Sequence, residues 1–302
     1  MSSPESGRAS AASDQIGQRP GAARGVLGEI VAMAHPRAVF IFATLALVVA
    51  LIAEQGALPL RVAVALVLAM AATQVAVGVF NDYCDRDLDA IAKPQRALPA
   101  GLVSPRTALA TGWLAVAIGL GTAATLGIPS MLVLAVGGGM GILYSVRLKR
   151  TVLSWLPYAV AYPIVPVWVW VSLGKFRPES LVIFPVTIPF SLGIHLCNQL
   201  RDYDEDAAQG MRGLVQHLGK MAAGRLCVGL LLAGPLPALV FTRGQGSGAI
   251  LLWLAVLAHW LLVVRCLTKY RRETAVVWQP LFRSLQISSP LVLSSWVYMT
   301  GP

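Results

Sequence analysis

Residues 59–89 read PLRVAVALVLAMAATQVAVGVFNDYCDRDLD, an apolar run that ends abruptly in a group of acidic side chains. The apolar part, 59–80, is long enough to cross the hydrocarbon core of a bilayer, which takes roughly 20 residues of helix. The nine residues that follow it, Asn81 to Asp89, contain four aspartates. This stretch therefore predicts a membrane helix whose end carries a metal-binding or phosphate-binding group at the membrane face.

The rest of the chain is also rich in apolar residues. Hydrophobic residues make up 56% of the 302 positions and charged residues only 13%, and the mean hydropathy is +0.69, outside the range of soluble globular domains. Only helices satisfy their backbone hydrogen bonds within one segment in lipid. We therefore expect an all-α integral membrane protein with nine transmembrane helices around a central cavity, near residues 38–54, 59–80, 107–126, 129–144, 152–173, 180–197, 226–241, 247–264 and 284–299.

The distribution of Lys and Arg predicts the orientation. Threading nine helices leaves four of the 24 basic residues on one side, Arg61, Lys175, Arg177 and Arg243, and the other 20 on the opposite side. The positive-inside rule then places the N-terminus on the cytoplasmic side of the cell membrane, together with the acidic segment at 81–89 and a second one at 198–206. The net charge of +10 is divided among short loops, which argues against nucleic-acid binding.

The N-terminal residues differ in composition from the rest of the chain. Residues 1–25 are rich in Ser, Gly, Ala and Arg and lack an apolar core, so we expect a disordered tail and no cleaved signal peptide. No long linker interrupts the remainder, which predicts a single domain over 26–302.

A second acidic segment, Asn198 to Asp206, follows the sixth apolar run and aligns with the first without a gap. Asn81 corresponds to Asn198, Asp85 to Asp202 and Asp89 to Asp206, and the two segments together hold eight of the 14 acidic residues. Repeat-built membrane proteins place binding sites between their halves. We therefore expect the two segments to face each other across a cavity.

Residues four apart on a helix differ in direction by about 40°, so each segment is expected to form a stripe of oxygen ligands. Stacked carboxylates at a helix C-terminus repel each other and the helix dipole, so cations must compensate them. Oxygen ligands without paired His or Cys favour Mg²⁺, which completes its shell with phosphate oxygens. The expected metal ligands are Asn81, Asp82, Asp85, Asp89, Asn198, Asp202 and Asp206, with Asp85, Asp89, Asp202 and Asp206 as the catalytic carboxylates.

A diphosphate at the mouth of an apolar helical chamber implies an isoprenoid tail inside it, and the expected reaction is ionisation to an allylic cation. Metal and basic side chains would stabilise the departing pyrophosphate, and aromatic faces would stabilise the cation. Two sets of residues are candidates. Diphosphate contacts are expected from Lys93, Arg96, Lys149 and Arg212, and pocket lining from Trp155, Tyr158, Tyr162 and His195.

The pattern Asn81-Asp82-x-x-Asp85-x-x-x-Asp89, followed by Lys93-Pro94-x-Arg96, resembles the first aspartate motif of the UbiA superfamily of intramembrane prenyltransferases. Asp202-x-x-x-Asp206 resembles its second motif, and Tyr144-Ser145 with Leu148-Lys149-Arg150 resembles the loop motif after its fourth helix. The resemblance implies Mg²⁺ and prenyl diphosphate at the aspartates, with Tyr144 among the diphosphate contacts. Ala97 follows Arg96 where the family commonly has proline, so the subfamily is not indicated.

The resemblance implies prenyl transfer to an acceptor that is small and hydrophobic or aromatic. Two alternatives remain at this point. A terpene cyclase of the same fold would quench the cation internally, and a divalent-cation transporter would use the carboxylates as a transport site. The acids stand at one mouth and not at mid-membrane, which disfavours the transporter. The sequence indicates neither the prenyl length nor the oligomeric state.

Overall fold

The computed structural model describes residues 25–242, 247–269 and 277–300, and the regular secondary structure in these ranges is entirely helical. Except for Gly25, the tail expected at 1–25 lies outside the described residues. The elements are α1 (Val26–Met33), α2 (Pro36–Ala53), α3 (Leu60–Ala92), α4 (Pro105–Ala124), α5 (Ile128–Val146), η1 (Leu148–Arg150), η2 (Val152–Trp155), α6 (Leu156–Ser172), η3 (Pro178–Val182), α7 (Ile183–Arg201), α8 (Tyr203–Ala208), α9 (Leu214–Leu218), α10 (Lys220–Ala233), α11 (Leu236–Val240), α12 (Ser247–Lys269) and α13 (Trp278–Thr300).

Within the described residues, eight helical segments are long and apolar enough to cross a membrane. They are α2, α3, α4, α5, η2 with α6, η3 with α7, α10 with α11, and α12. The protein is therefore a multi-pass membrane protein. The ninth expected segment, 284–299, lies in α13, which is 23 residues long but carries Arg283, two glutamines and five serines. Its membrane crossing, like the cytoplasmic N-terminus, stays a prediction.

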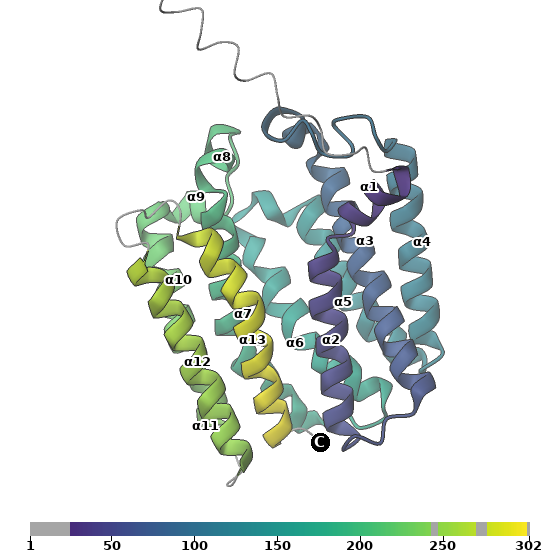
Figure 1. Cartoon of the computed structure of the whole chain (residues 1–302), viewed down its shortest axis with the longest axis vertical. Helices are drawn as coiled ribbons and strands as arrows, with labels where there is room; N and C mark the ends of the chain where they lie inside the picture. The colour runs from purple at the N-terminus through teal and green to yellow at the C-terminus, as the bar shows by residue number, and fades with distance from the viewer. Residues whose placement is uncertain (1–24, 243–246, 270–276, 301–302) are drawn as a thin grey trace, which may run out of the picture.

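The long helices run roughly parallel or antiparallel to one another, as Figure 1 shows from the side, and their contacts close into a ring. Going round it, α2 packs against α3, α3 against α5, α5 against α6, α6 against α7, α7 against α13, and α13 closes the ring on α2. Three further helices add a partial second layer: α4 packs on α3 and α5, α10 on α7, and α12 on α13. Large apolar side chains such as Leu114 on α4 and Ile250 and Leu257 on α12 are exposed, as expected of surfaces that face lipid.

The two acidic segments are positioned in different ways. At 33 residues α3 is about 50 Å long, well beyond the roughly 30 Å of the hydrocarbon core, so its acidic end can stand outside the lipid. The second segment is not the continuous helix that we expected, because α7 ends at Arg201 and α8 begins at Tyr203. The break moves the last three acids of this segment into the first turn of α8, where a helix dipole favours negative charge.

The glycines in the run 137–141 of α5 permit close contacts with neighbouring helices. A β-carbon at Gly141 would lie 2.8 Å from Val77 of α3, whereas one at Gly139 would have no neighbour within 4 Å. We expect Gly141→Ala to lower the free energy of unfolding by about 1–3 kcal/mol, because α5 must move away from α3. Thermal denaturation in detergent measures this, with Gly139→Ala as the matched control. Equal melting temperatures for the two variants would contradict the expectation.

Candidate active site

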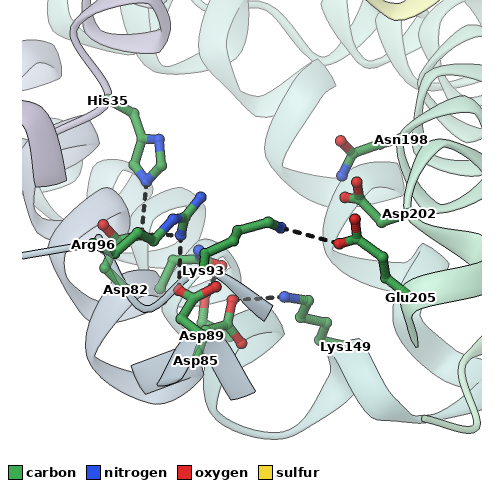
Figure 2. A network of polar contacts seen from close by, with 12 residues as sticks. His35, Asp82, Asp85, Asp89, Lys93, Arg96, Lys149, Asn198, Asp202 and Glu205 are labelled. Carbon is green, nitrogen blue, oxygen red and sulfur yellow. Dashed lines mark hydrogen bonds and ion pairs between the residues drawn. The ribbon is translucent and has the colours of Figure 1, made fainter. Parts of the chain in front are cut away.

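Both acidic segments line one cavity of about 660 Å³ at the end of the ring where α3 and α7 terminate. Figure 2 shows Asp85 and Asp89 on one side and Asn198, Asp202 and Glu205 on the other. The structure therefore brings together residues that are more than a hundred positions apart in the sequence. From the two segments, the cavity is lined by Asn81, Asp85, Leu88, Asp89, Asn198, Gln199, Arg201, Asp202, Glu205 and Asp206.

On the α3 side, each buried carboxylate has a basic partner. Lys149, in η1 after α5, places its Nζ 2.6 Å from Oδ2 of Asp85. Arg96, in the turn after α3, places Nη1 2.9 Å from Oδ2 of Asp89. Asp85 and Asp89 are only 6% and 7% exposed, so these charges need the compensation that their partners supply.

On the opposite side, Arg201 binds Asp202 through two hydrogen bonds, from Nε to Oδ1 at 3.0 Å and from Nη2 to Oδ2 at 2.5 Å. Lys93 reaches across the cavity, and its Nζ lies 3.5 Å from Oε2 of Glu205 (Figure 2). Burial raises the pKa of Asp206 to about 6, while nearby Lys149 acts in the opposite direction. The cavity is thus a balanced arrangement of carboxylates and cations.

The side chains present suit Mg²⁺. The inward-facing donors of the two segments are carboxylate and amide oxygens, the ligands that hard divalent cations prefer. Within the described ranges, no three His, Cys, Asp or Glu side chains are grouped closely enough to hold an ion by themselves. Mg²⁺ commonly binds through one or two carboxylates and takes its other ligands from water and phosphate. The donor set therefore fits an ion that arrives with a phosphate-bearing substrate.

A second, mainly apolar cavity of about 180 Å³ lies next to the first and is lined by residues of α2, α3, α5 and α6. The two cavities share Gln74, Val77, Tyr144 and Tyr158 as lining residues. Tyr158 stacks on Tyr162, with ring centroids 5.7 Å apart and an interplanar angle of 16°. The polar cavity therefore meets the apolar one at a wall of tyrosine rings.

Two residues expected at the diphosphate and metal do not line the polar cavity. Asp82 accepts a hydrogen bond from Arg96 at 3.3 Å and pairs with Nε2 of His35 at 3.0 Å (Figure 2). A step of one residue turns a helix by about 100°, so Asp82 projects away from the stripe that begins at Asn81. Arg212 is exposed in the connection between α8 and α9 and is not among the lining residues.

Two of the four residues expected to line the pocket also lie elsewhere. Trp155 is the last residue of η2, directly before α6, and it lines neither cavity. His195 is completely buried behind Tyr158, with ring centroids 4.6 Å apart, and its Nε2 lies 3.1 Å from Oγ of Ser154. Both positions depend on which residues neighbouring helices cover, and the sequence of one helix does not show that.

Other lining residues were missed at the sequence level. Arg201 entered the sequence analysis only as one of the 20 basic residues on one side, yet it lines the cavity and pairs with Asp202. Gln279, Arg283 and Gln286 of α13 also line it. Their spacing of four and three residues places them on one helix face, and this polar stripe within an apolar segment was the signal available in the sequence.

Two known enzymes are similar in sequence to parts of this chain. The chain is 31% identical over 165 residues to chlorophyll synthase of Oryza sativa subsp. japonica, covering 50% of this chain and 43% of the relative. It is 28% identical over 199 residues to 4-hydroxybenzoate octaprenyltransferase of Vibrio cholerae serotype O1, covering 65% and 69% of the two chains. The chain thus spans less than half the length of the plant relative.

Solved structures show the same fold. A UbiA homologue from Archaeoglobus fulgidus bound to GPP and Mg²⁺ superposes with a TM-score of 0.70 at 18% identity, covering 90% of this chain and 99% of the other. The model of the UbiA prenyltransferase family matches residues 39–286, which include both acidic segments and most of the helical ring. The chain is therefore a member of the UbiA prenyltransferase family.

Proposed function

We propose that this protein is a Mg²⁺-dependent prenyltransferase that moves an isoprenyl group from a prenyl diphosphate to a small hydrophobic or aromatic acceptor within the membrane. One observation carries the proposal: a cavity lined by carboxylates and cations shares a wall of tyrosines with an apolar cavity between the helices. A prenyl diphosphate has the same division into a charged head and an apolar chain.

The proposed metal ligands are Asn81, Asp85, Asp89, Asn198, Asp202 and Asp206, all of which line the polar cavity. Mg²⁺ held there would neutralise the diphosphate and stabilise the pyrophosphate as it leaves. A solved relative of the same fold binds GPP and Mg²⁺, which supports this choice of ion and headgroup.

In this structure three basic side chains of the cavity pair with acids: Lys149 with Asp85, Arg96 with Asp89, and Lys93 with Glu205. We propose that these cations turn toward the phosphate oxygens when substrate binds, while the carboxylates take up the metal. Ammonium and guanidinium groups form charge-assisted hydrogen bonds with phosphate. Positive charge would then already stand where the leaving group develops negative charge.

The allylic carbon of the substrate would lie against the rings of Tyr144 and Tyr158. The rings of Tyr144 and Tyr158 meet edge to face, with centroids 5.6 Å apart, and Nδ2 of Asn198 donates a hydrogen bond to the Tyr158 hydroxyl at 3.4 Å. Fixed aromatic faces attract a cation, and the apolar cavity beyond them would keep water from it. The acceptor would then capture the cation in place of water.

We further propose that the cavity faces the cytoplasm across the cell membrane. The support is the distribution of 20 against four Lys and Arg residues between the two sides of the threaded chain.

Incubation of the detergent-solubilised protein with Mg²⁺, prenyl diphosphates of several lengths and a panel of phenolic acids and quinone precursors tests the proposal. Mass spectrometry should detect a prenylated acceptor that forms only when both substrates are present. A hydrocarbon product from prenyl diphosphate alone would instead identify a terpene cyclase. Unchanged prenyl diphosphate under every condition would contradict both activities.

A further inference from the structure

The apolar cavity has a defined far end. On α6 it runs from Tyr158, beside the polar cavity, to Trp168, ten residues further along the helix. At 1.5 Å per residue this is a depth of about 15 Å. On α5 and α3 the deepest lining residues include Leu134 and Met70. Trp168, Leu134 and Met70 are 0%, 3% and 3% exposed, so packed side chains close this end.

Trp168 is fixed by more than packing. Its indole N–H donates a hydrogen bond to Oγ of Ser130 at 3.1 Å. Oγ of Ser130 lies 2.7 Å from Oγ of Ser172, and Ser172 donates to the Trp168 carbonyl at 2.7 Å. This closed set of hydrogen bonds joins α5 to α6 and holds the largest side chain of the floor in one orientation. Opening the floor would break these bonds and expose buried polar groups.

The way from the apolar cavity into the neighbouring cavity is also obstructed. A third cavity, of about 70 Å³, lies between α2, α7 and α13, and it shares Phe42 and Tyr162 with the apolar cavity and Ala38 and Gln286 with the polar cavity. These two rings meet edge to face with centroids 5.6 Å apart. A long chain that has entered the apolar cavity would therefore have to displace either this aromatic pair or Trp168 to extend further between the helices.

We infer that Trp168 sets the length of the prenyl chain that the protein accepts, with chains up to farnesyl preferred over geranylgeranyl and longer ones. The inference rests on the proposed function and names its donor substrate class. A geranyl or farnesyl chain fits the depth of the cavity, whereas a longer chain meets the indole. Shape selection by a packed wall of this kind changes discrimination by about tenfold or more.

Equilibrium binding of dimethylallyl, geranyl, farnesyl and geranylgeranyl diphosphates in the presence of Mg²⁺ tests the inference without an acceptor. Wild-type protein should bind geranyl or farnesyl diphosphate more tightly than geranylgeranyl diphosphate. Trp168→Leu should shift the ratio of Kd values toward the longer chain by about tenfold or more, and Trp168→Phe should shift it less. Binding of inorganic pyrophosphate, which has no chain, should not change.

Two tryptophans provide matched controls. Trp170 lies on the same helix, is 1% exposed and does not line the apolar cavity, so Trp170→Leu should reduce stability without altering the chain-length ratio. Trp296 is also 1% exposed and lines the third cavity. A shift in Trp296→Leu, with none in the Trp168 variants, would place the chain in the third cavity and overturn the inference.

The remaining outcomes distinguish failure of the chain-length inference from failure of the proposed function. Binding of all lengths with a ratio unchanged in both Trp168 variants would overturn the chain-length inference and leave the proposed function standing. Failure of wild-type protein to bind any of the four diphosphates would overturn the proposed function and the inference with it. Trp168→Phe, which removes less volume, provides the comparison if Trp168→Leu does not fold.

Discussion

Asp85→Asn is expected to lower kcat/KM for prenyl transfer by at least about a hundredfold, the loss typical when one preorganised electrostatic contact is removed. Asp85 lines the polar cavity, is 6% exposed and pairs with Lys149 at 2.6 Å. An amide keeps the size of the side chain but removes the negative charge that would bind the metal and compensate the lysine. We therefore expect the chemistry to fail while the fold persists.

The same segment supplies the control for this experiment. The side chain of Asp87 is 84% exposed, pairs only with neighbouring Arg86 among the described residues, and does not line the cavity. Asp87→Asn should therefore retain wild-type turnover. Steady-state kinetics compares the variants, and melting temperatures in detergent check that both are folded. Substantial turnover by a folded Asp85→Asn variant would contradict its assignment as a catalytic carboxylate.

Removal of divalent cations is expected to abolish prenyl transfer, and addition of Mg²⁺ or Mn²⁺ should restore it. The physical reason is the charge on the substrate headgroup. Asp85, Asp89 and Asp202 each already have a basic partner, so much of the positive charge in the cavity is already compensated and a bound metal would supply what the diphosphate needs. Loss of the ion leaves the leaving group without that stabilisation.

Product formation measured after treatment with excess chelator, and again after the metal is restored, tests this expectation. The melting temperature before and after treatment separates loss of chemistry from loss of fold. Full activity in excess chelator would contradict a metal-dependent mechanism. Restoration by Zn²⁺ but not by Mg²⁺ would contradict the oxygen-ligand argument on which the choice of metal depends.

The long apolar runs were sufficient to predict membrane helices, and eight of the nine expected segments coincide with helices long and apolar enough to cross a bilayer. Helix α13 shows where average hydropathy is an insufficient guide. It carries Gln279, Arg283 and Gln286 on one face toward the polar cavity, which lowers its hydropathy. Hydropathy averages over a helix and does not register that its polar side chains point inward.

The two acidic segments show how residue spacing in the sequence relates to the positions of the side chains in the folded protein. On α3, where the residues are spaced four apart, Asn81, Asp85 and Asp89 lie along one cavity wall. On the other side α7 stops at Arg201 and α8 starts after Asp202, and both Asp202 and Asp206 still line the cavity. The aspartate pattern was thus a better guide than the assumption of an unbroken helix.

The sequence alone determined the membrane character, the two aligned acidic segments and the oxygen-rich chemistry, because composition and short-range spacing are properties of the chain itself. Only the tertiary structure decided that Asp82 turns toward His35, that His195 is buried behind Tyr158, and that Trp168 closes the apolar cavity. These outcomes depend on how each helix is rotated against its neighbours. Rotation is set by contacts between residues far apart in sequence, and periodicity within one helix does not contain that information.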